Sequence, residues 1–428
     1  MVVLVCLGAP AAALGASGAA PGASGAALGP PGAAATASNP GRRADAARTR
    51  DCSDARYPAT RDPSNPLMLP NPPGENPLNG ARFFVDGPRH GSAASAIARL
   101  LGIDPTRYPD NYSWARFRRD LDDGPLHRRL EGRPILRYQV HELEKIADQP
   151  EVQRFSAYSG GGGPGAIYGQ VQKILCDNLT ADPGSIPVVT TYFAHAVLGG
   201  CPTAAAIAAA TPTFERRINE VAAGTGRRPI VFLLEIDGFG SSACMAHIGT
   251  LVDYERLIKY EVDTLGALPH AVVYVEAGYS DSNSPGYTAR ALNHVDIGRI
   301  RGFFTNDTHE NWTINEANWG ERVSRLTHGA HFIINTAQNG DGPKLNPHPR
   351  YQGVEDLCNP PGRGLGPRLT FNPGFPNVDA LMWTHVPGNS SGSCNGGPAP
   401  GTFWPTRAID LATQANSRYG PGYASDPY

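Results

Sequence analysis

The sequence has little charge and no excess of either sign. Charged residues make up 18% of the 428 residues, and 37 Lys and Arg against 39 Asp and Glu leave a formal net charge of -2. A protein that binds nucleic acid or an anionic membrane by electrostatic attraction normally carries a basic patch or a basic excess. We therefore expect no nucleic acid among the partners and a neutral ligand instead.

The sequence also lacks C-x-x-C pairs and long apolar runs. The seven cysteines are too scattered for a zinc site or a redox motif, and no stretch has the roughly 18 apolar residues of a membrane span. The glycine run at 160–163 is not followed by the G-K-[ST] of a phosphate loop. With 50 Gly and 40 Pro, a coiled coil or a helical bundle is excluded. We expect no metal, no cofactor and no membrane span.

Composition divides the chain into three regions. Residues 1–25 resemble a signal segment with a short apolar start, although no Lys or Arg precedes it as in most secretory signals. Residues 26–75 are rich in Ala, Gly and Pro and are expected to form a disordered linker. Residues 76–428 are long enough for one catalytic domain. We expect a secreted, extracellular monomer, in which six of the cysteines can form three disulfides.

Strands and helices alternate from residue 187 onward. Short apolar runs read as buried strands, and they begin at Pro187, Pro229, Ala271, Gly302, Ala330 and Val378. Helical stretches lie between them, among them 214–223, 252–265 and 313–326, and further helical segments are predicted upstream at 91–102 and 141–155. Strand followed by helix, repeated, indicates parallel strands. The fold class is therefore α/β, a distorted (β/α) barrel with its cleft at the carboxyl ends of the strands.

Carboxylates and amides gather at those strand ends. The last residues of each run and the following loop hold Glu235, Asp237, Glu276, Asn306, Asp307, Asn335, Asn339, Asp341, His385 and Asn389, with Trp312, Trp319 and Trp383 nearby. Planar hydrogen-bonding groups beside aromatic faces suit a neutral ligand with many hydroxyls, such as a sugar. The alternative is that the Asn and Asp side chains cap helices and that the tryptophans belong to the core.

The segment IVFLLEIDGFGSSACM places an acidic residue directly after a buried strand, where desolvation favours the protonated form that a glycosidic acid needs. From about residue 81 to 425 the chain resembles glycoside hydrolase family 6, the inverting endoglucanases and cellobiohydrolases. Seven stretches occur in the family's order. They are FFVDG, which resembles the opening strand, PVVTTYF, LLEIDGFGSSACM, YVEAGYS, GFFTNDTHENWT, FIINTAQNGDGP and LMWTHVPGNSSGSC.

The resemblance implies a role for some residues and leaves others in doubt. Asp237 matches the family's general acid, and Glu235 matches the carboxylate two residues earlier. The family's Asp before its first cysteine is Gly200 here. Other charged or aromatic positions are replaced by Glu276, Tyr279, Ser282, Asn335, Gln338, Leu357, His385, Asn389 and Ser391. The implied substrate-binding residues are Glu235, Tyr192, Asn306, Asn335, Trp383, His385 and Asn389.

These replacements bear on the mechanism. An inverting glycosidase needs one acid for the leaving oxygen and a second carboxylate for the water. Asp237 is the expected acid, and Glu276 or Asp341 is the expected base. With two stacking tryptophans lost, a branched or substituted β-linked polysaccharide, β-1,4-glucan-like, is the expected substrate. A relative that binds glycan without cleaving it is the alternative, and a structural cell-surface protein is favoured only if the cleft is closed.

The family also implies the cysteine pairing. Cys201 with Cys244 and Cys358 with Cys394 lie where the family has its two disulfides, and Cys52 with Cys176 is then an additional bridge. A competing motif, G-x-S-x-G at 388–392, matches the nucleophile elbow of serine hydrolases. That elbow requires a helix after the serine and a later histidine, but a Gly/Pro-rich loop comes next here and no histidine lies beyond His385.

Overall fold

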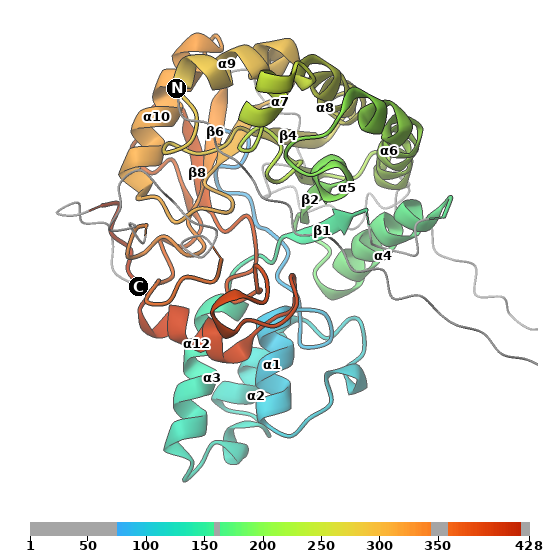
Figure 1. Ribbon diagram of the computed structural model, residues 1–428. Coiled ribbons are helices and arrows are strands. Elements are labelled where there is room, and N and C mark those ends of the chain that lie inside the picture. Colours follow the sequence, from blue (N-terminus) through green and yellow to red (C-terminus); the bar gives the residue numbers. More distant parts are fainter. Residues whose placement is uncertain (1–74, 158–162, 344–357, 421–428) are drawn as a thin grey trace, which may run out of the picture. The chain divides into compact units, whose positions relative to one another are not determined.

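A mostly parallel sheet of eight strands organises the fold (Figure 1). The computed structural model describes residues 75–157, 163–343 and 358–420, all within one compact unit, Arg50–Tyr428. The predicted signal-like segment, all but the last residue of the predicted linker, and Cys52 therefore lie outside the described residues. The strands are β1 (Gln153–Ser156), β2 (Val188–Tyr192), β3 (Ile230–Leu234), β4 (Ala271–Glu276), β5 (Gly302–Thr305), β6 (His331–Asn335), β7 (Thr370–Phe371) and β8 (Val378–Met382).

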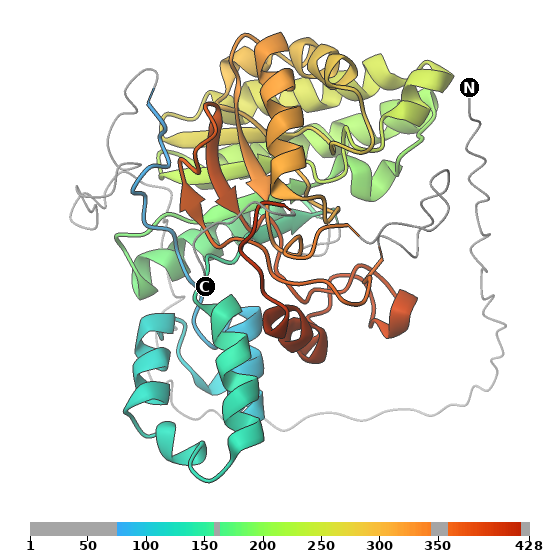
Figure 2. The same cartoon turned by 90° about the vertical axis from the view of Figure 1, so that its left-hand side faces the viewer.

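The order of the strands follows the chain except at the end. Neighbours in the sheet run β1-β2-β3-β4-β5-β6-β8-β7, and each pair is parallel apart from the antiparallel pair of β7 with β8. The carboxyl ends of β1 to β6 and β8 consequently lie along one edge of the sheet (Figure 2). This arrangement confirms the predicted succession of parallel strands.

Helices connect the strands and cover the sheet. They are α1 (Ser92–Leu100), α2 (Trp114–Asp122), α3 (Pro134–Ala147), α4 (Ala166–Ala181), α5 (Ala194–Leu198), α6 (Ala204–Thr225), α7 (Ala243–Ile248), α8 (Leu251–Gly266), α9 (Pro285–His294), α10 (Thr313–Leu326) and α12 (Pro405–Thr413). None of the helices in the described ranges combines the length and the apolar character needed to cross a bilayer.

Both faces of the sheet are buried, as alternation along each strand requires. On β3, Ile230, Phe232 and Leu234 pack against helices such as α6 and α8. The residues between them, Val231 and Leu233, join a second cluster that fills the inner face together with side chains of β2, β4, β5, β6 and β8. An apolar outer layer and a filled interior give the distorted barrel expected from the sequence.

A separate apolar cluster joins α1, α2, α3 and α12, which lie together in Figure 1. Trp383, at the end of β8, is part of this cluster and is 3% exposed. Its indole Nε1 donates to the carbonyl of Pro367 at 3.0 Å. The ring expected to stack on sugar is therefore a core side chain, because the residue after β8 turns toward the helices.

Some predicted boundaries were wrong. Residues 141–155 were predicted to be helical throughout, but α3 ends at Ala147 and residues 153–156 form β1, since Pro150 lacks the N–H that a helix needs. Phe83 forms an isolated bridge with Ile186, so FFVDG is not the opening strand. The helix predicted at 214–223 begins at Ala204, because Thr203 Oγ1 accepts from the Ala206 N–H at 3.2 Å and caps the Ala-rich run.

Candidate active site

A cleft of ≈ 390 Å³ opens at the carboxyl ends of the strands. Its lining comes from β1, from the ends of β2 and β3, and from the loops after β5, β6 and β8. The lining residues are Arg154, Tyr192, Ile236, Asp237, Asp307, Thr308, Glu310, Gln338, Cys358, His385, Asn389, Ser390, Ser391, Pro400 and Gly401. Of the predicted site residues, Asp237, Tyr192, His385 and Asn389 meet here.

Asp237 is held by two hydroxyl groups. Its Oδ1 accepts from the Tyr279 hydroxyl at 2.6 Å and from Thr308 Oγ1 at 2.8 Å, and these two hydroxyls lie 2.6 Å apart. The aromatic ring reaches Asp237 because position 240 is glycine, where a Cβ would lie 2.5 Å from Cε2 of Tyr279. The side chain is half-buried and lines the cleft. One carboxylate oxygen is therefore fixed in position by neighbouring elements.

The backbone around Asp237 is in an uncommon conformation. Glu235, Asp237 and Asn306 have φ values of 51°, 61° and 68°, in the left-handed region that favours glycine. Residues in such conformations cost of order 1 kcal/mol or more and collect at functional sites. In this fold they turn the chain sharply after β3 and β5, which brings Asp237 and Asp307 into the same cleft.

Glu235 does not line the cleft but connects two elements by hydrogen bonds. The carboxylate is 1% exposed and accepts from the backbone N–H groups of Phe193 at 2.7 Å, Ala194 at 2.9 Å and His195 at 3.3 Å. Burial raises the pKa of Glu235 to about 7, against the lowering effect of these donors. The side chain therefore ties the start of α5 to the end of β3.

Glu276, at the end of β4, connects two loops by hydrogen bonds in the same way. It is fully buried and accepts from the N–H groups of Phe239 at 2.7 Å, Gly240 at 3.1 Å and Gly278 at 2.5 Å. Burial, followed by the charge of Asp237, raises its pKa to about 8. The carboxylate expected to be the base is used to hold the loop after Asp237, and it is absent from the lining of the cleft.

Asp341, the other expected base, also lies outside the lining of the cleft. It is half-buried, and its Oδ2 lies 3.0 Å from the position that a Cβ at Gly364 would occupy. The position of Asp341 therefore gives no support to a role in activating water.

Asn306 and Asn335 lock two strand ends together. Asn306 Nδ2 donates to the Asn335 carbonyl at 3.0 Å, and Asn335 Nδ2 donates to the Asn306 carbonyl at 2.8 Å. Both are at most 1% exposed. The amides predicted to bind substrate join β5 to β6 instead, because reciprocal bonds satisfy the backbone groups at the two strand ends.

The other predicted residues of the cleft differ in character. Burial lowers the pKa of His385 to about 4, so its imidazole is neutral, and its Nε2 lies 2.8 Å from Gln338 Nε2. Asn389 lines the cleft and forms an isolated bridge with Phe403. The Arg154 guanidinium lies 5.6 Å from the centre of the Tyr192 ring. A cation, a neutral imidazole and an aromatic ring thus share this wall.

Sequence reasoning missed several residues of the cleft. Arg154 lies in the stretch predicted to be helical, so the sequence did not predict its position in β1. Thr308 and Glu310 follow β5 in a loop whose course the sequence does not indicate. Glu310 is 4% exposed, and burial raises its pKa to about 8. The signal in the sequence was their place after a buried strand that is followed by Asn306 and Asp307.

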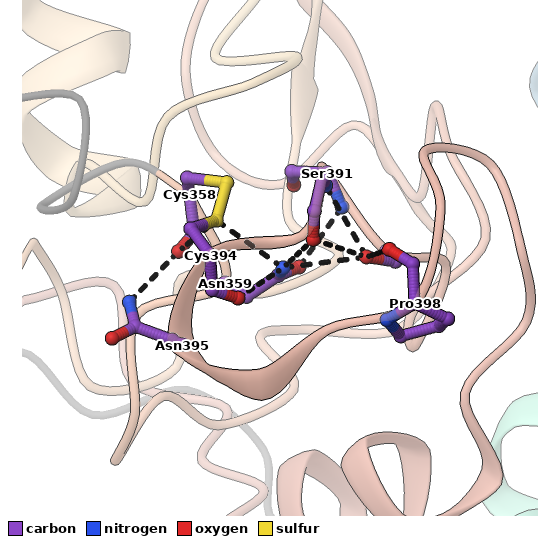
Figure 3. Close-up of a disulfide and its surroundings, with 8 residues drawn as sticks. Cys358, Asn359, Ser391, Cys394, Asn395 and Pro398 are labelled. Carbon is purple, nitrogen blue, oxygen red and sulfur yellow. Dashed lines mark hydrogen bonds between the residues drawn. A yellow bond between two sulfur atoms is a disulfide. The ribbon is translucent and has the colours of Figure 1, made fainter.

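The two disulfides implied by the family resemblance are confirmed, Cys201 with Cys244 and Cys358 with Cys394. Beside the second, Asn359 Oδ1 accepts from the Ser391 N–H at 2.9 Å and its Nδ2 donates to the Gly392 carbonyl at 2.8 Å (Figure 3). Cys176 is also disulfide-bonded, and Cys52, its predicted partner, lies outside the described residues. The second disulfide therefore fixes a wall of the cleft, which Cys358 and Ser391 line.

A cluster of possible metal ligands lies among residues that do not line the cleft. Ligand atoms of His90, Asp110 and Asp177 lie within 4.8 Å of one another. Arg89 Nε is 2.7 Å from Asp110 Oδ1, and Lys173 forms an ion pair with Asp177. Because these two cations already neutralise the carboxylates, the cluster does not point to a metal in the reaction.

The chain is similar to known glycosidases in sequence and in fold. Residues 203–415 match the family described as Glycosyl hydrolases family 6. Endoglucanase A of Cellulomonas fimi is 30% identical over 275 residues, which cover 64% of this chain and 56% of that protein. Endoglucanase 1 of Streptomyces sp. (strain KSM-9) is 31% identical over 279 residues, which cover 63% of this chain and 70% of that protein.

A solved structure agrees with these relatives. The endoglucanase Cel6 from Mycobacterium tuberculosis, in complex with methyl-cellobiosyl-4-deoxy-4-thio-β-D-cellobioside, has a TM-score of 0.62 and 29% identity. The match covers 79% of this chain and 99% of that one. The resemblance seen in the seven sequence stretches is thereby confirmed. The matched residues, the identities and the shared sheet show that the chain belongs to glycosyl hydrolases family 6.

Proposed function

We propose that the protein hydrolyses a β-linked, β-1,4-glucan-like polysaccharide with inversion and that Asp237 is the general acid. The observation that carries this proposal is the position of Asp237, which follows β3 and lines a polar cleft with Oδ1 fixed by Tyr279 and Thr308. Membership of a glycosidase family supports the reaction class. Relatives named endoglucanase, and a neighbour holding a thio-cello-oligosaccharide, support the substrate class.

In the proposed reaction Asp237 gives its proton to the leaving glycosidic oxygen. A water attacks the anomeric carbon from the opposite face, which inverts the configuration. Inverting enzymes separate their two carboxyl groups by roughly 6.5 to 9.5 Å so that the water fits between acid and base. The cleft holds two further carboxyl groups besides Asp237, on Asp307 and Glu310, so a second carboxyl group is available.

The cleft composition favours an uncharged polyhydroxylated ligand. Amide, hydroxyl and imidazole groups of Gln338, Asn389, Ser390, Ser391 and His385 provide donors and acceptors. Disulfides persist in oxidising compartments, so the bonded cysteines support the proposal that the protein works outside the cell. We further propose that it acts as a monomer.

One observation favours a second function, the binding of glycan without cleavage. Neither Glu276 nor Asp341, the carboxylates expected to be the base, lines the cleft. If no other carboxylate activates water, the cleft binds a chain and leaves it intact.

Release of reducing ends from soluble β-glucans tests the proposal. We expect the native protein to be active and Asp237→Asn to lose at least ~100-fold in kcat, the usual contribution of a general acid. Asp253→Asn, a surface change on α8 whose carboxylate pairs with Arg256, is the matched control and should keep full activity. NMR of the first product should show the α-anomer. A native protein that binds cello-oligosaccharides and releases nothing supports the second function.

A further inference from the structure

Asp307 is a second carboxyl group in the cleft, and the proposed acid, Asp237, gives it no role. It follows β5 directly after Asn306 and lines the same cleft as Asp237, although its residue surface is only 1% exposed. Thr384 Oγ1 donates to its Oδ1. Its Oδ2 is buried and meets no donor within the described part of the chain.

A buried carboxylate oxygen without a donor is costly. Leaving such a group unsatisfied costs the desolvation free energy of the group, which is largest when the group is charged, so nearly all buried acceptors bind a protein group or an ordered water. Asp307 is one of the residues that line the cleft. A water of the cleft that donates a hydrogen bond to Oδ2 would be held in the way that a general base holds its nucleophile.

We propose that Asp307 is the carboxylate that activates the hydrolytic water, an inference that rests on the proposed hydrolase function. Asp307 Oδ2 takes a proton from the water as the water oxygen bonds to the anomeric carbon. The bond between that carbon and the glycosidic oxygen breaks, and its electron pair takes the proton of Asp237. Asp307 ends protonated and Asp237 ionised, and one proton passes through solvent to restore both.

The surroundings hold Asp307 firmly. Asn335 Nδ2 donates to the Asp307 carbonyl at 3.1 Å, and Asn335 Oδ1 accepts from the Thr384 N–H at 3.0 Å. One amide therefore positions both the carboxylate residue and the hydroxyl that binds its Oδ1. Oδ2 is therefore the oxygen of this carboxylate that accepts no hydrogen bond within the described residues.

The charge state separates Asp307 from Glu310. Burial raises the pKa of Asp307 to about 6, against the lowering effects of the Thr384 hydrogen bond and the Arg154 charge, while the charge of Asp237 raises it further. Burial raises the pKa of Glu310 to about 8. Near neutral pH Asp307 is mostly ionised and can accept a proton, whereas Glu310 is mostly protonated. The neighbouring His385 is neutral, because burial lowers its pKa to about 4.

The test compares Asp307→Asn and Asp307→Ala with the native protein on a soluble β-glucan. Asn keeps an acceptor for Thr384 and preserves the shape of the site, so we expect unchanged cello-oligosaccharide affinity by calorimetry and at least ~100-fold lower kcat. Sodium azide should restore turnover by Asp307→Ala and yield a glycosyl azide, which a merely structural role would not produce. Asp253→Asn is again the control, and circular dichroism reports folding.

A second measurement needs no variant. If Asp307 must be ionised, kcat/KM of the native protein falls as the pH drops through about 6, the pKa of that carboxyl. An active protein whose Asp307→Asn variant stays within about twofold of native kcat overturns the assignment and leaves the hydrolase function intact. Equal loss in Glu310→Gln or Asp341→Asn, with azide rescue there and none at position 307, assigns the base elsewhere. A native protein without activity on any glycan overturns both proposals.

Discussion

At the residue scale, two hydroxyl groups hydrogen-bonded to Asp237 fix the orientation of the proposed acid. Tyr279 and Thr308 both donate to Oδ1, which leaves Oδ2 for the proton and the substrate. The Tyr279 ring is stacked on His309, with 3.7 Å between ring centres and 9° between planes, and His309 Nδ1 lies 3.0 Å from Asp281 Oδ1. Asp281 therefore helps to hold His309, on which the Tyr279 ring is stacked, and the Tyr279 hydroxyl in turn binds Asp237.

The change Tyr279→Phe removes one of these donors and keeps the stacked ring. A hydrogen bond to a charged group contributes about 1.5 to 3 kcal/mol, so kcat should fall about 10- to 100-fold with little change in KM. Steady-state kinetics measure kcat and KM separately. A variant that keeps the native kcat would show that the hydroxyl does not act on the acid.

At the element scale, two buried glutamates at the ends of β3 and β4 bind the loops that follow the preceding strands. Glu235 binds three backbone N–H groups at the start of α5, and Glu276 binds three in the loops after β3 and β4. Each stands at the end of a strand whose side chains are buried on both faces, so these carboxyls are buried as well. They stiffen the strand ends on which the cleft is built.

Their raised pKa values make stability depend on pH. Because burial raises the pKa of Glu276 to about 8 and of Glu235 to about 7, the folded state binds more protons than the unfolded state above pH ~4.5, the ordinary value for glutamate. The free energy of unfolding should therefore decrease as the pH rises from about 5 to 8. Urea unfolding at several pH values measures this slope. In Glu276→Gln the slope should be smaller, and a slope that stays the same would assign the pH dependence to other groups.

At the scale of the whole molecule, disulfides connect segments far apart in the chain. Cys358 and Cys394 are 36 residues apart and border the cleft, whereas Cys201 and Cys244 are 43 apart and join the segment after α5 to α7. The first disulfide is braced by Asn359, which binds Ser391 and Gly392 (Figure 3). It thus links the stability of the fold to the shape of the cleft.

Removing the disulfide at the cleft should affect both properties. The double variant Cys358→Ser with Cys394→Ser should lose roughly 3 to 4 kcal/mol of stability, the chain-entropy value for a loop of this length. KM should rise as well, because the disulfide no longer fixes the wall of the cleft that contains Ser391. The pair Cys201→Ser with Cys244→Ser is the matched comparison, with a similar loss of stability and a smaller change in KM. Equal KM changes in both pairs would contradict a specific role for the wall.

Much of the fold was predictable from the sequence, because it rests on local patterns. The six apolar runs from Pro187 onward became β2 to β6 and β8, and residues 313–326 form α10 as predicted. Short runs of β-branched and aromatic residues are typical of strands that are buried on both faces of a sheet. The upstream stretch 141–155 was mispredicted, since a proline between two short patterns marks a boundary but does not indicate whether the next element is a helix or a strand.

For the site, the sequence by itself determined that acidic and amide residues end neighbouring parallel strands and that Asp237 follows β3. Only the tertiary structure decided which of these side chains enter the cleft. Glu235, Asp237 and Asn306 adopt left-handed backbone conformations. Such conformations cannot be predicted from the sequence at these positions, because they favour glycine and none of the three residues is glycine. Those turns bury Glu276, Asn306 and Asn335 as joints and bring Asp307 into the cleft with Asp237, because the packing of neighbouring loops sets side-chain direction at a strand end.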